Sequence, residues 1–400
     1  MKKIVSIILL TVTSLGLAQN QQTILEVDSI KAIISLEGGV SIQSSSITNS
    51  LINKVYSDGF FTNEVKQDVV NRLDKFNTRY SDNSYIQLGY KTGGKKINWS
   101  VNLRQRSNSF AQINANFLKL TMYGNKQFRG QDLNLGNTIF VTQLYQSLGF
   151  GLEKNINKFT FGGSLNVLKG SYLDFFSIED GSLFTAQDGT EILAKGKIRS
   201  ITSDSHSGKD WSGLGLSFDA SVQYDVSDEL LFRLEADDIG FIKWKSLKHT
   251  KGTIDKALTP YQINLLNPSA SFNSKIKLDE ILGLTSQNSS FTYRTAGNVH
   301  FLAKAKIRKN ISMRAGVRVY TTAGAIPLVY LNPMYKLKKH ALGLTLQAGG
   351  YGYKDIILNY EWVIANRVHL LVNANVLEAL LAPSTTSSQG LNASLLYYLR

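Results

Sequence analysis

Apolar and polar residues alternate through positions 296–400 in short runs with almost nothing between them. Successive side chains of a β-strand point to opposite faces, so each run has one apolar face and one polar face. The apolar face collects Phe301, Ala303, Ala305, Ile307, Ile311, Met313, Ala315, Val317, Val319, Leu342, Leu344, Leu346 and Ala348. The other face collects His300, Lys304, Lys306, Arg308, Ser312, Arg314, Arg318, Thr345 and Gln347. This succession predicts an antiparallel meander.

Two architectures are compatible with such one-sided strands. A soluble sandwich exposes its polar faces to outside water, whereas a transmembrane barrel turns them inward and presents its apolar faces to lipid. The runs are about 10 residues long, carry aromatic residues near both ends and have tight turns on one side only, as in transmembrane barrels. We therefore predict an all-β fold, a transmembrane antiparallel β-barrel of the outer membrane, formed by residues 19–400 as a single domain.

Residues 1–18 have the features of a secretory signal peptide. Lys2 and Lys3 precede an apolar core at residues 4–10, and the small residues Gly16 and Ala18 follow it. We expect cleavage after Ala18 and export of the remaining chain. The apolar core is too short for a transmembrane helix, and no other apolar run approaches its length. Membrane insertion must therefore use strands.

The composition limits the classes of molecule that this chain is expected to bind. The chain has 32 Gly but only 5 Pro, and it has 18 Tyr and 19 Phe, which suits strands with aromatic girdles. The net charge is +14, and two of these charges are in the signal peptide. For an exported chain, this basic excess favours outer-membrane lipids or an anionic solute over nucleic acid. There is no Cys, so neither disulfides nor thiol chemistry are expected.

Turn signals set the number of strands. They fall at residues 92–96, 154–158, 227–229, 309–310, 337–339 and 366–367. The intervals between them have room for two strands each, and two more strands fit at either end of the chain. The total is fourteen, an even number that leaves both termini on the periplasmic side.

The opposite connections are uneven in length. We expect four long extracellular loops, at residues 44–83, 107–137, 170–212 and 247–288. In the first, residues 64–76 place Val65, Val69, Leu73 and Phe76 at helical spacing. This short helix would either pack on a neighbouring loop at the rim or act as a plug or gate.

Three segments resemble signature segments of a known group of proteins. Residues 123–130 (YGNKQFRG), 161–170 (FGGSLNVLKG) and 237–244 (DDIGFIKW) resemble those of an uncharacterised family of Bacteroidota outer-membrane barrels. That family is distantly similar to the FadL long-chain fatty-acid transporters and to the barrel partner of the type IX secretion system. The resemblance implies a fourteen-stranded barrel.

The chain departs from the FadL-like pattern in two places. The first proline is Pro260, so the early Asn-Pro-Ala turn of the FadL-like group is missing. The chain ends on Arg400 instead of an aromatic residue, although Leu395, Tyr397 and Leu399 keep the alternation. The first departure argues against an N-terminal hatch of the FadL type.

The third segment also breaks the strand alternation. Arg233, Glu235 and Asp237 share one face, and the parity changes at residues 238–240. A change of parity inside a strand predicts a β-bulge. Such a bulge changes the direction of side chains and is common at barrel rims and next to functional sites. We expect Trp244 to end this strand in the outer aromatic girdle.

The inward faces hold the only candidates for chemistry in the lumen. Our candidate lumen-facing residues are Arg104, Arg106, Arg233, Glu235, Asp237, Lys304, Lys306, Arg314, Arg318, Glu361 and His369. Acids and bases on adjacent strands favour a network of ion pairs that fills and rigidifies the barrel. The basic excess is also compatible with an anion-selective pore.

Catalytic and metal-binding patterns are weak. His369 followed by Asn373 and Asn375 is a poor basis for a serine hydrolase, and the five His residues show no paired metal spacing. Residues 202–210 have oxygen ligands but lack the spaced acids of a calcium loop. We therefore predict neither an enzyme nor a cofactor or metal site.

Two functional hypotheses follow, ahead of a third, an outer-membrane hydrolase that would need a Ser beside His300 or His369. The first is a FadL-like conduit or binding barrel for a hydrophobic or anionic small solute, which predicts an apolar pocket among the long loops. The second is a non-transporting barrel that docks other outer-membrane proteins in a secretion-type assembly.

Overall fold

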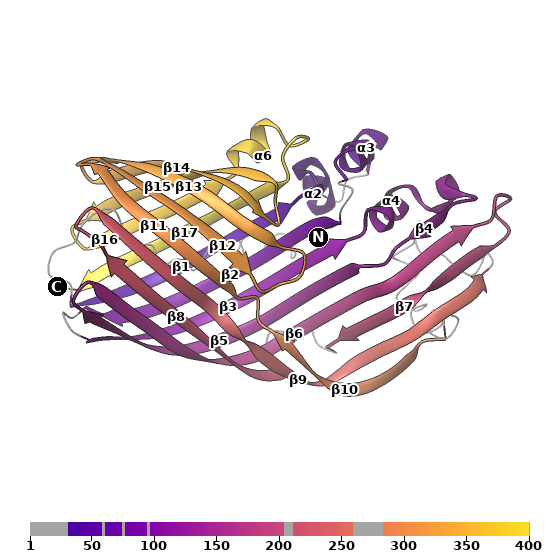
Figure 1. Ribbon diagram of the computed structural model, residues 1–400, viewed down its shortest axis with the longest axis horizontal. Coiled ribbons are helices and arrows are strands. Elements are labelled where there is room, and N and C mark those ends of the chain that lie inside the picture. Colours follow the sequence, from indigo (N-terminus) through magenta and orange to yellow (C-terminus); the bar gives the residue numbers. More distant parts are fainter. Residues whose placement is uncertain are drawn as a thin grey trace.

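The first strand pairs with the last, and this pairing closes the sheet into a barrel. In the computed structural model, strand β1 (Ala32–Ser44) pairs with both β17 (Ser388–Leu399) and β2 (Thr78–Thr92) (Figure 1). The structure describes residues 31–57, 61–73, 77–93, 97–203, 211–258 and 283–399, so the predicted signal peptide at residues 1–18 lies outside them. Closure leaves no free sheet edge between the two ends of the chain.

Seventeen strand segments form the sheet, which is entirely antiparallel in its pairing. The remaining strands are β3 (Ile97–Ile113), β4 (Asp132–Asn134), β5 (Thr138–Ile156), β6 (Phe159–Thr185), β7 (Ile192–Thr202), β8 (Gly213–Asp225), β9 (Leu230–Leu258), β10 (Thr285–Arg294), β11 (Asn298–Arg308), β12 (Ile311–Tyr320), β13 (Ile326–Leu337), β14 (His340–Gly350), β15 (Lys354–Ala365) and β16 (Val368–Asn375). Three pairs of segments, β4 with β5, β7 with β8 and β10 with β11, lie in line along a shared neighbour. The barrel therefore has 14 strand positions, as predicted.

Five of the predicted tight turns connect successive strands at one end of the barrel, and the sixth, at residues 92–96, falls between β2 and β3, with residues 94–96 outside the described part of the chain. The two ends of the described chain lie at the same end of the barrel. We call this the turn end, and the opposite end the long-strand end. Asn157 and Lys338 adopt left-handed backbone conformations at two of these turns, with φ of 54° and 52°. Asn occupies this region more readily than most residues, which makes the β5–β6 turn locally favourable.

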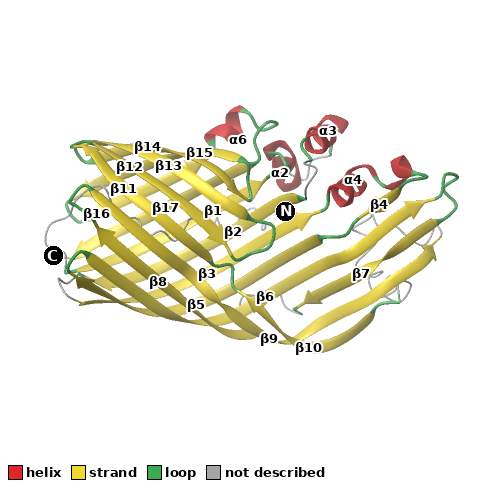
Figure 2. Cartoon of the chain, in the orientation of Figure 1, coloured by secondary structure: helices red, strands yellow, loops and turns green. Residues whose placement is uncertain are grey.

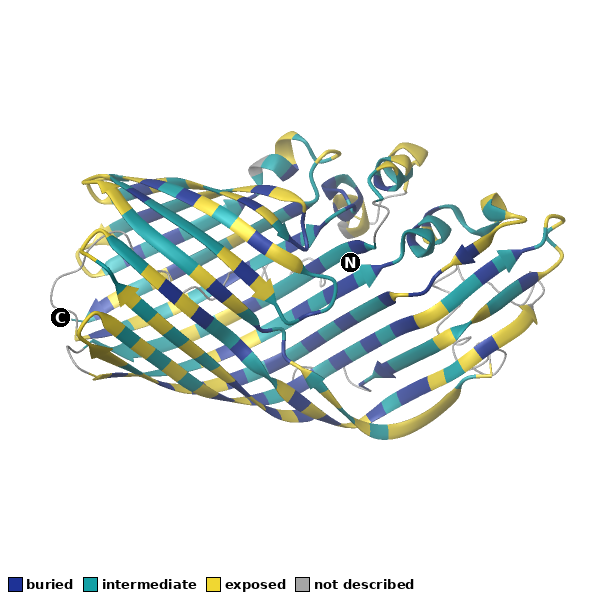
Figure 3. Ribbon diagram, in the orientation of Figure 1, coloured by how far each residue is buried: buried dark blue, intermediate teal, exposed yellow. Residues whose placement is uncertain are grey.

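The outer wall is an apolar band. Alternate residues along the strands are exposed and buried, which gives the checkered pattern in Figure 3. One row of exposed apolar residues continues in register across six strands: Leu88, Leu103, Leu148, Val167, Leu216 and Phe241. Their side chains are between 47% and 57% exposed. An outward apolar surface of this extent is what a transmembrane barrel presents to lipid.

Aromatic residues border this band near the turn end. Phe159 and Tyr224 stack with ring centroids 4.7 Å apart, and Phe232 and Phe301 stack at 6.1 Å. Their position on adjacent strands matches the aromatic girdle predicted for one end of the strands.

Two of the four predicted loops contain long strand extensions instead. Residues 170–212 contain the continuation of β6 to Thr185 and the whole of β7, which pairs with both β6 and β9. Residues 247–258 continue β9, while residues 259–282 lie outside the described part of the chain. These strands project beyond β11–β16 at the long-strand end (Figure 1). The alternation is interrupted there by a bulge between Ile178 and Gly181, which changes its parity.

The other two predicted loops contain helices (Figure 2). The expected helix at residues 64–76 is present but shorter, as α3 (Asn63–Asn71), and α2 (Asn49–Tyr56) precedes it. Helix α4 (Ala115–Tyr123) is followed by a 3-10 turn (Asn125–Phe128), and α6 (Leu377–Leu381) lies between β16 and β17. Val69 of α3 packs with Leu118 of α4 in one apolar cluster, which agrees with the rim-helix interpretation of residues 64–76.

The predicted bulge in β9 is present. Phe218 pairs with Ile239 but Ala220 pairs with Ala236, and Asp238 adopts a left-handed φ of 53°. The bulge reverses the parity of β9, so Trp244 points inward and is 0% exposed. The prediction that Trp244 belongs to an outer aromatic girdle was therefore wrong, because it ignored the effect of the bulge on the following residues.

We expect Leu165→Arg, in the middle of the outward band of β6, to destabilise the barrel by about 2–4 kcal/mol in a bilayer. Leu165 is 60% exposed, so the substitution perturbs lipid contact and not the interior packing. Unfolding by denaturant in lipid vesicles measures the change. Gln287→Arg, at an exposed position of β10, is the control, with an expected change within about 0.5 kcal/mol. Equal stability of the two variants would contradict a lipid-facing band.

Candidate binding cavity in the barrel lumen

The predicted lumen residues all lie on the inward parity of their strands. Six of them are buried: Arg104, Arg233, Glu235, Arg318, Glu361 and His369. Arg106, Asp237, Lys304 and Arg314 are half-buried, and Lys306 is exposed near the turn end. The structure thus brings most of the predicted set into one interior, although in separate groups.

The first group surrounds the bulge of β9. Arg106 on β3 lies 3.0 Å from the Asp238 carboxylate, and the Tyr145 hydroxyl donates a hydrogen bond to the same carboxylate. Asp238 was not among the predicted residues, because the strand alternation placed Asp237 and not Asp238 inside. The bulge turns Asp238 inward as well, next to Asp237, and Asp238 is only 2% exposed.

A second carboxylate fixes the bulge itself. The backbone N–H of Asp238 donates to Asp219 Oδ1 at 2.7 Å. Ser164 and Asn166 on β6 donate to the other oxygen, Asp219 Oδ2, at 2.7 and 3.1 Å. Ser164 and Asn166 thus satisfy one oxygen of the Asp219 carboxylate. The other oxygen accepts from the Asp238 N–H, a backbone group that the bulge removes from regular strand pairing.

The second group is centred on Glu235. Arg233 Nε lies 2.6 Å from Glu235 Oε1, and His300 Nδ1 lies 3.2 Å from Glu235 Oε2. The other ring nitrogen of His300 is 2.9 Å from the Tyr330 hydroxyl. This chain joins β9, β11 and β13 across the interior, as the ion-pair interpretation expects.

The remaining cations also have interactions. Arg314 lies 3.9 Å from Glu361, and Lys91 lies 2.8 Å from Glu153 near the turn end. Lys304 and Lys306 also take part in interactions. The side chain of Arg318 is 1% exposed and that of His369 is 3% exposed, so neither offers an open charged surface.

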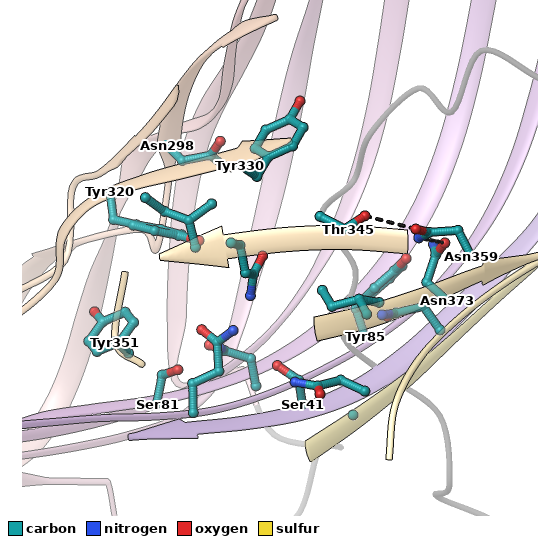
Figure 4. Close-up of a pocket in the computed structure, with 18 of the residues that line it drawn as sticks. Ser41, Ser81, Tyr85, Asn298, Tyr320, Tyr330, Thr345, Tyr351, Asn359 and Asn373 are labelled. Atoms are coloured by element: carbon teal, nitrogen blue, oxygen red, sulfur yellow. Dashed lines mark hydrogen bonds between the residues drawn. The ribbon is translucent and has the colours of Figure 1, made fainter. Parts of the chain in front are cut away.

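An open cavity of about 180 Å³ lies in the lumen beside these groups. Its lining comes from β1, β2 and β3 on one side and from β11 to β17 on the other. Figure 4 shows Ser41, Tyr85, Asn359 and Asn373 converging on this space from different strands. Ten of the 30 lining residues are Asn or Gln and only three are charged, so the wall is predominantly neutral and polar.

A hydrogen-bonded ladder of neutral groups forms one wall of the cavity. Asn332 Nδ2 donates to Asn359 Oδ1 at 2.7 Å, and the Thr345 hydroxyl donates to the same oxygen at 2.8 Å. Asn359 Nδ2 then donates to Asn373 Oδ1 at 2.7 Å (Figure 4). Register continues this row, since Asn373 pairs with Asn392 on β17.

An apolar cluster lies on the long-strand side of the cavity. Its buried members include Leu168, Leu173, Ile201, Ile242 and Trp244. Phe110 and Tyr351 belong both to this cluster and to the cavity wall. The cluster is closely packed, so the open space lies next to it and not inside it.

Tyr351 closes the cavity toward the connection between β14 and β15. Its hydroxyl donates to the Ala323 carbonyl and is also hydrogen-bonded to Thr322 Oγ1. Burial raises the pKa of Tyr351, so the phenol remains neutral at physiological pH. It therefore acts as a neutral polar group at the junction of cavity and apolar cluster.

Most of the cavity wall was not predicted from the sequence. Asn373 and Asn375 entered only beside His369 as a weak hydrolase pattern, and Asn332, Thr345 and Asn359 were not selected as site residues. Each of these residues has inward parity, which was a usable signal. Their convergence depends on the register between strands, which alternation within one strand does not determine.

Within the described ranges, no three His, Asp, Glu or Cys side chains are close enough to form a metal site. Among the helices that the structure describes, none is both long and apolar enough to cross a membrane. The residues of the suspected calcium-type loop after Ser203 lie outside the described part.

The chain belongs to a family of unknown function, DUF5723, which matches residues 31–377. It matches no curated protein sequence. Its fold is similar to that of a monoaromatic hydrocarbon channel, the TodX deltaS2S3 mutant, with a TM-score of 0.50, 9% identity and coverage of 92% of this chain and 90% of that chain. The Ralstonia pickettii toluene transporter TbuX matches at a TM-score of 0.47 and 8% identity, covering 93% and 90% of the two chains.

A Pseudomonas aeruginosa FadL homologue matches at a TM-score of 0.44 and 7% identity, covering 92% and 91% of the two chains. At these identities the similarity concerns the fold. The match to the monoaromatic hydrocarbon channel supports the predicted barrel fold.

We expect Gly170→Ala to destabilise the apolar cluster beside the cavity. A Cβ atom at Gly170 would lie 2.7 Å from Trp244 Cζ3, and the buried indole has no free space into which to move. Overpacking of this kind costs about 1–3 kcal/mol. Denaturant unfolding followed by tryptophan fluorescence measures it.

Gly163→Ala on the same strand is the matched control for Gly170→Ala. Its added Cβ would come no closer than 3.6 Å to a neighbouring atom, so we expect little change in stability. Equal losses in the two variants would show that Gly170 does not make room for Trp244.

Proposed function

We propose that this protein is an outer-membrane conduit or binding barrel for a small solute that enters the lumen cavity. The observation that carries the proposal is an open cavity inside a closed barrel of 14 strand positions, lined by side chains from ten different strands. A cavity enclosed by the wall of a barrel is a typical solute site, because it is concave and preformed. The FadL-like fold supports transport over a purely structural role.

The predicted signal peptide and the sidedness of the turns orient the barrel. In this orientation the turn end faces the periplasm and the long-strand end faces the exterior. The apolar cluster with Trp244 then lies on the external side of the cavity, and the ion pairs of Lys91 and Arg314 lie toward the periplasm. A solute from outside would pass the apolar cluster before it reaches the amide-lined space.

The arrangement favours an amphipathic solute with an apolar part. Phe110 and Tyr351 connect the apolar cluster to the cavity, so one molecule can contact both surfaces. An anionic solute is supported less, because the two cations of the cavity wall, Arg106 and Arg314, face the carboxylates of Asp238 and Glu361. The predicted apolar pocket among the loops is replaced in this proposal by the apolar cluster at the inner wall.

Docking of another outer-membrane protein is the second candidate function. Leu380 and Leu381 of α6 are 76% and 82% exposed at the long-strand end. Two adjacent exposed leucines at a barrel rim are unusual for a surface that meets only water, and they fit contact with a partner. This observation supports the proposal of a barrel within a larger, secretion-type assembly.

Purification from the native outer membrane in mild detergent, followed by mass spectrometry of what remains bound, separates the two functions. For a conduit we expect a defined small amphipathic molecule and no polypeptide in stoichiometric amount. A stoichiometric polypeptide with no small molecule would contradict the conduit and support docking.

We expect Thr345→Trp to fill the cavity and to reduce the amount of bound small molecule about tenfold, because the indole occupies space that the solute needs. The adjacent Leu344→Trp is the control, since Leu344 points outward and is 43% exposed. Loss of the small molecule in both variants would show that it sits on the outer wall as lipid and not in the cavity.

A further inference from the structure

We infer that the cavity recognises a neutral head group rich in hydroxyls, of the glycoside type, on an amphipathic solute. This inference rests on the proposed function and specifies the chemistry of its solute. It differs from the hydrocarbons carried by the channels of similar fold, and it is drawn from the cavity wall alone.

The first argument is the neutrality of the wall. Ten of the 30 lining residues are amides, five are Ser or Thr, and five are Tyr. The two cations are compensated, as Arg106 is 3.0 Å from Asp238 and Arg314 is 3.9 Å from Glu361. A carboxylate or phosphate head group would have to displace one of these acids, which is costly in a buried site.

The second argument is the match between amides and hydroxyls. A side-chain amide presents both donors and an acceptor, and a hydroxyl does the same, so the two satisfy each other in either direction. Thr345, Asn359 and Asn373 hold each other in fixed positions through hydrogen bonds of 2.7 and 2.8 Å. Such mutual fixing presents the remaining polar capacity of the ladder in a preorganised arrangement.

The third argument is an unsatisfied acceptor in the wall. Asn375 is 6% exposed, and its Nδ2 donates to Ser388 Oγ at 2.9 Å. Its Oδ1 atom has no hydrogen-bond partner in the described part of the chain, and the same holds for Oδ1 of Asn298 across the cavity. Buried acceptors without donors are rare, so the wall holds spare acceptor capacity beside the ladder.

The fourth argument concerns the ring faces and the tail. Tyr85, Tyr320 and Tyr330 have inward parity and place flat aromatic surfaces among the amides, and such faces pack against the C–H face of a sugar ring. Phe110 and Tyr351 belong to both the cavity wall and the apolar cluster, so they form an apolar side of the cavity against which an alkyl tail can lie. A pure hydrocarbon in the cavity would strip water from the amides and return no hydrogen bond, which disfavours it.

The test compares three probes with the same six-carbon tail: hexyl β-D-glucoside, hexanoate and hexane. Their binding to the full-length mature barrel in lipid nanodiscs is measured by equilibrium dialysis at pH 7, with empty nanodiscs subtracted. We expect the glucoside to bind about tenfold more tightly than either of the other two, since only its head group pairs with the amide wall.

Variants connect this preference to the ladder. Thr345→Val, which is nearly isosteric, and Asn359→Leu should each weaken glucoside binding about fivefold or more while leaving hexane binding unchanged. Gln223→Leu is the matched control, because Gln223 hydrogen-bonds Asp225 at 2.8 Å and is not part of the cavity wall. Thr345→Val removes a hydroxyl with almost no change in volume, so it remains informative if Asn359→Leu fails to fold.

Each outcome decides between the proposals. Tighter binding of the glucoside that is lost in Thr345→Val supports the inference. Equal binding of all probes, a preference for hexanoate or hexane, or a glucoside preference unaffected by Thr345→Val overturns it and leaves a conduit for another solute. Failure of every probe to bind, together with a stoichiometric polypeptide partner in the purified material, overturns the inference and the proposed conduit together.

Discussion

Closure of the sheet is the constraint on which the rest of the structure depends. A strand at a sheet edge presents unpaired backbone groups, and in lipid no water can satisfy them. Pairing of β1 with β17 removes that edge along twelve residue pairs, from Ala32 with Leu399 to Gln43 with Ser388. Once the sheet is closed, alternate residues of every strand must share an interior. The lumen network, the amide ladder and the cavity are all consequences of that requirement.

The bulge of β9 divides the interior into a polar part and an apolar part. It reverses the parity of the strand, so that residues before it contribute Arg233 and Glu235 to the lumen and residues after it contribute Ile242 and Trp244. Asp219 holds the bulge through the Asp238 backbone N–H, and Asp238 in turn pairs with Arg106. A single irregular position therefore separates a polar, ion-paired part of the lumen from an apolar one. The cavity lies where the two parts meet.

The interior is also divided around its circumference. Charged side chains concentrate on the wall from β3 to β11, whereas neutral amides and hydroxyls dominate the wall from β13 to β17 and β1. Ion pairs on the first wall compensate one another and leave little net charge for a solute. The second wall keeps hydrogen-bonding capacity without charge. A lumen built in this way selects a solute by hydrogen bonds and shape more than by charge.

The barrel could be predicted from the sequence, because alternation and turn signals are local properties of the chain. Leu342, Leu344 and Leu346 needed only their spacing to be placed on the outer wall, and Asn157 needed only its preference for left-handed φ to mark a turn. Three features could be seen only in the tertiary structure: the inward position of Trp244, the role of Asp238 and the hydrogen bond between Thr345 and Asn359. Each of these depends on bulges or on register between strands, and a shift of one residue in either changes which side chains meet. For this reason the fold could be predicted from the sequence, whereas the wall of the binding cavity could not.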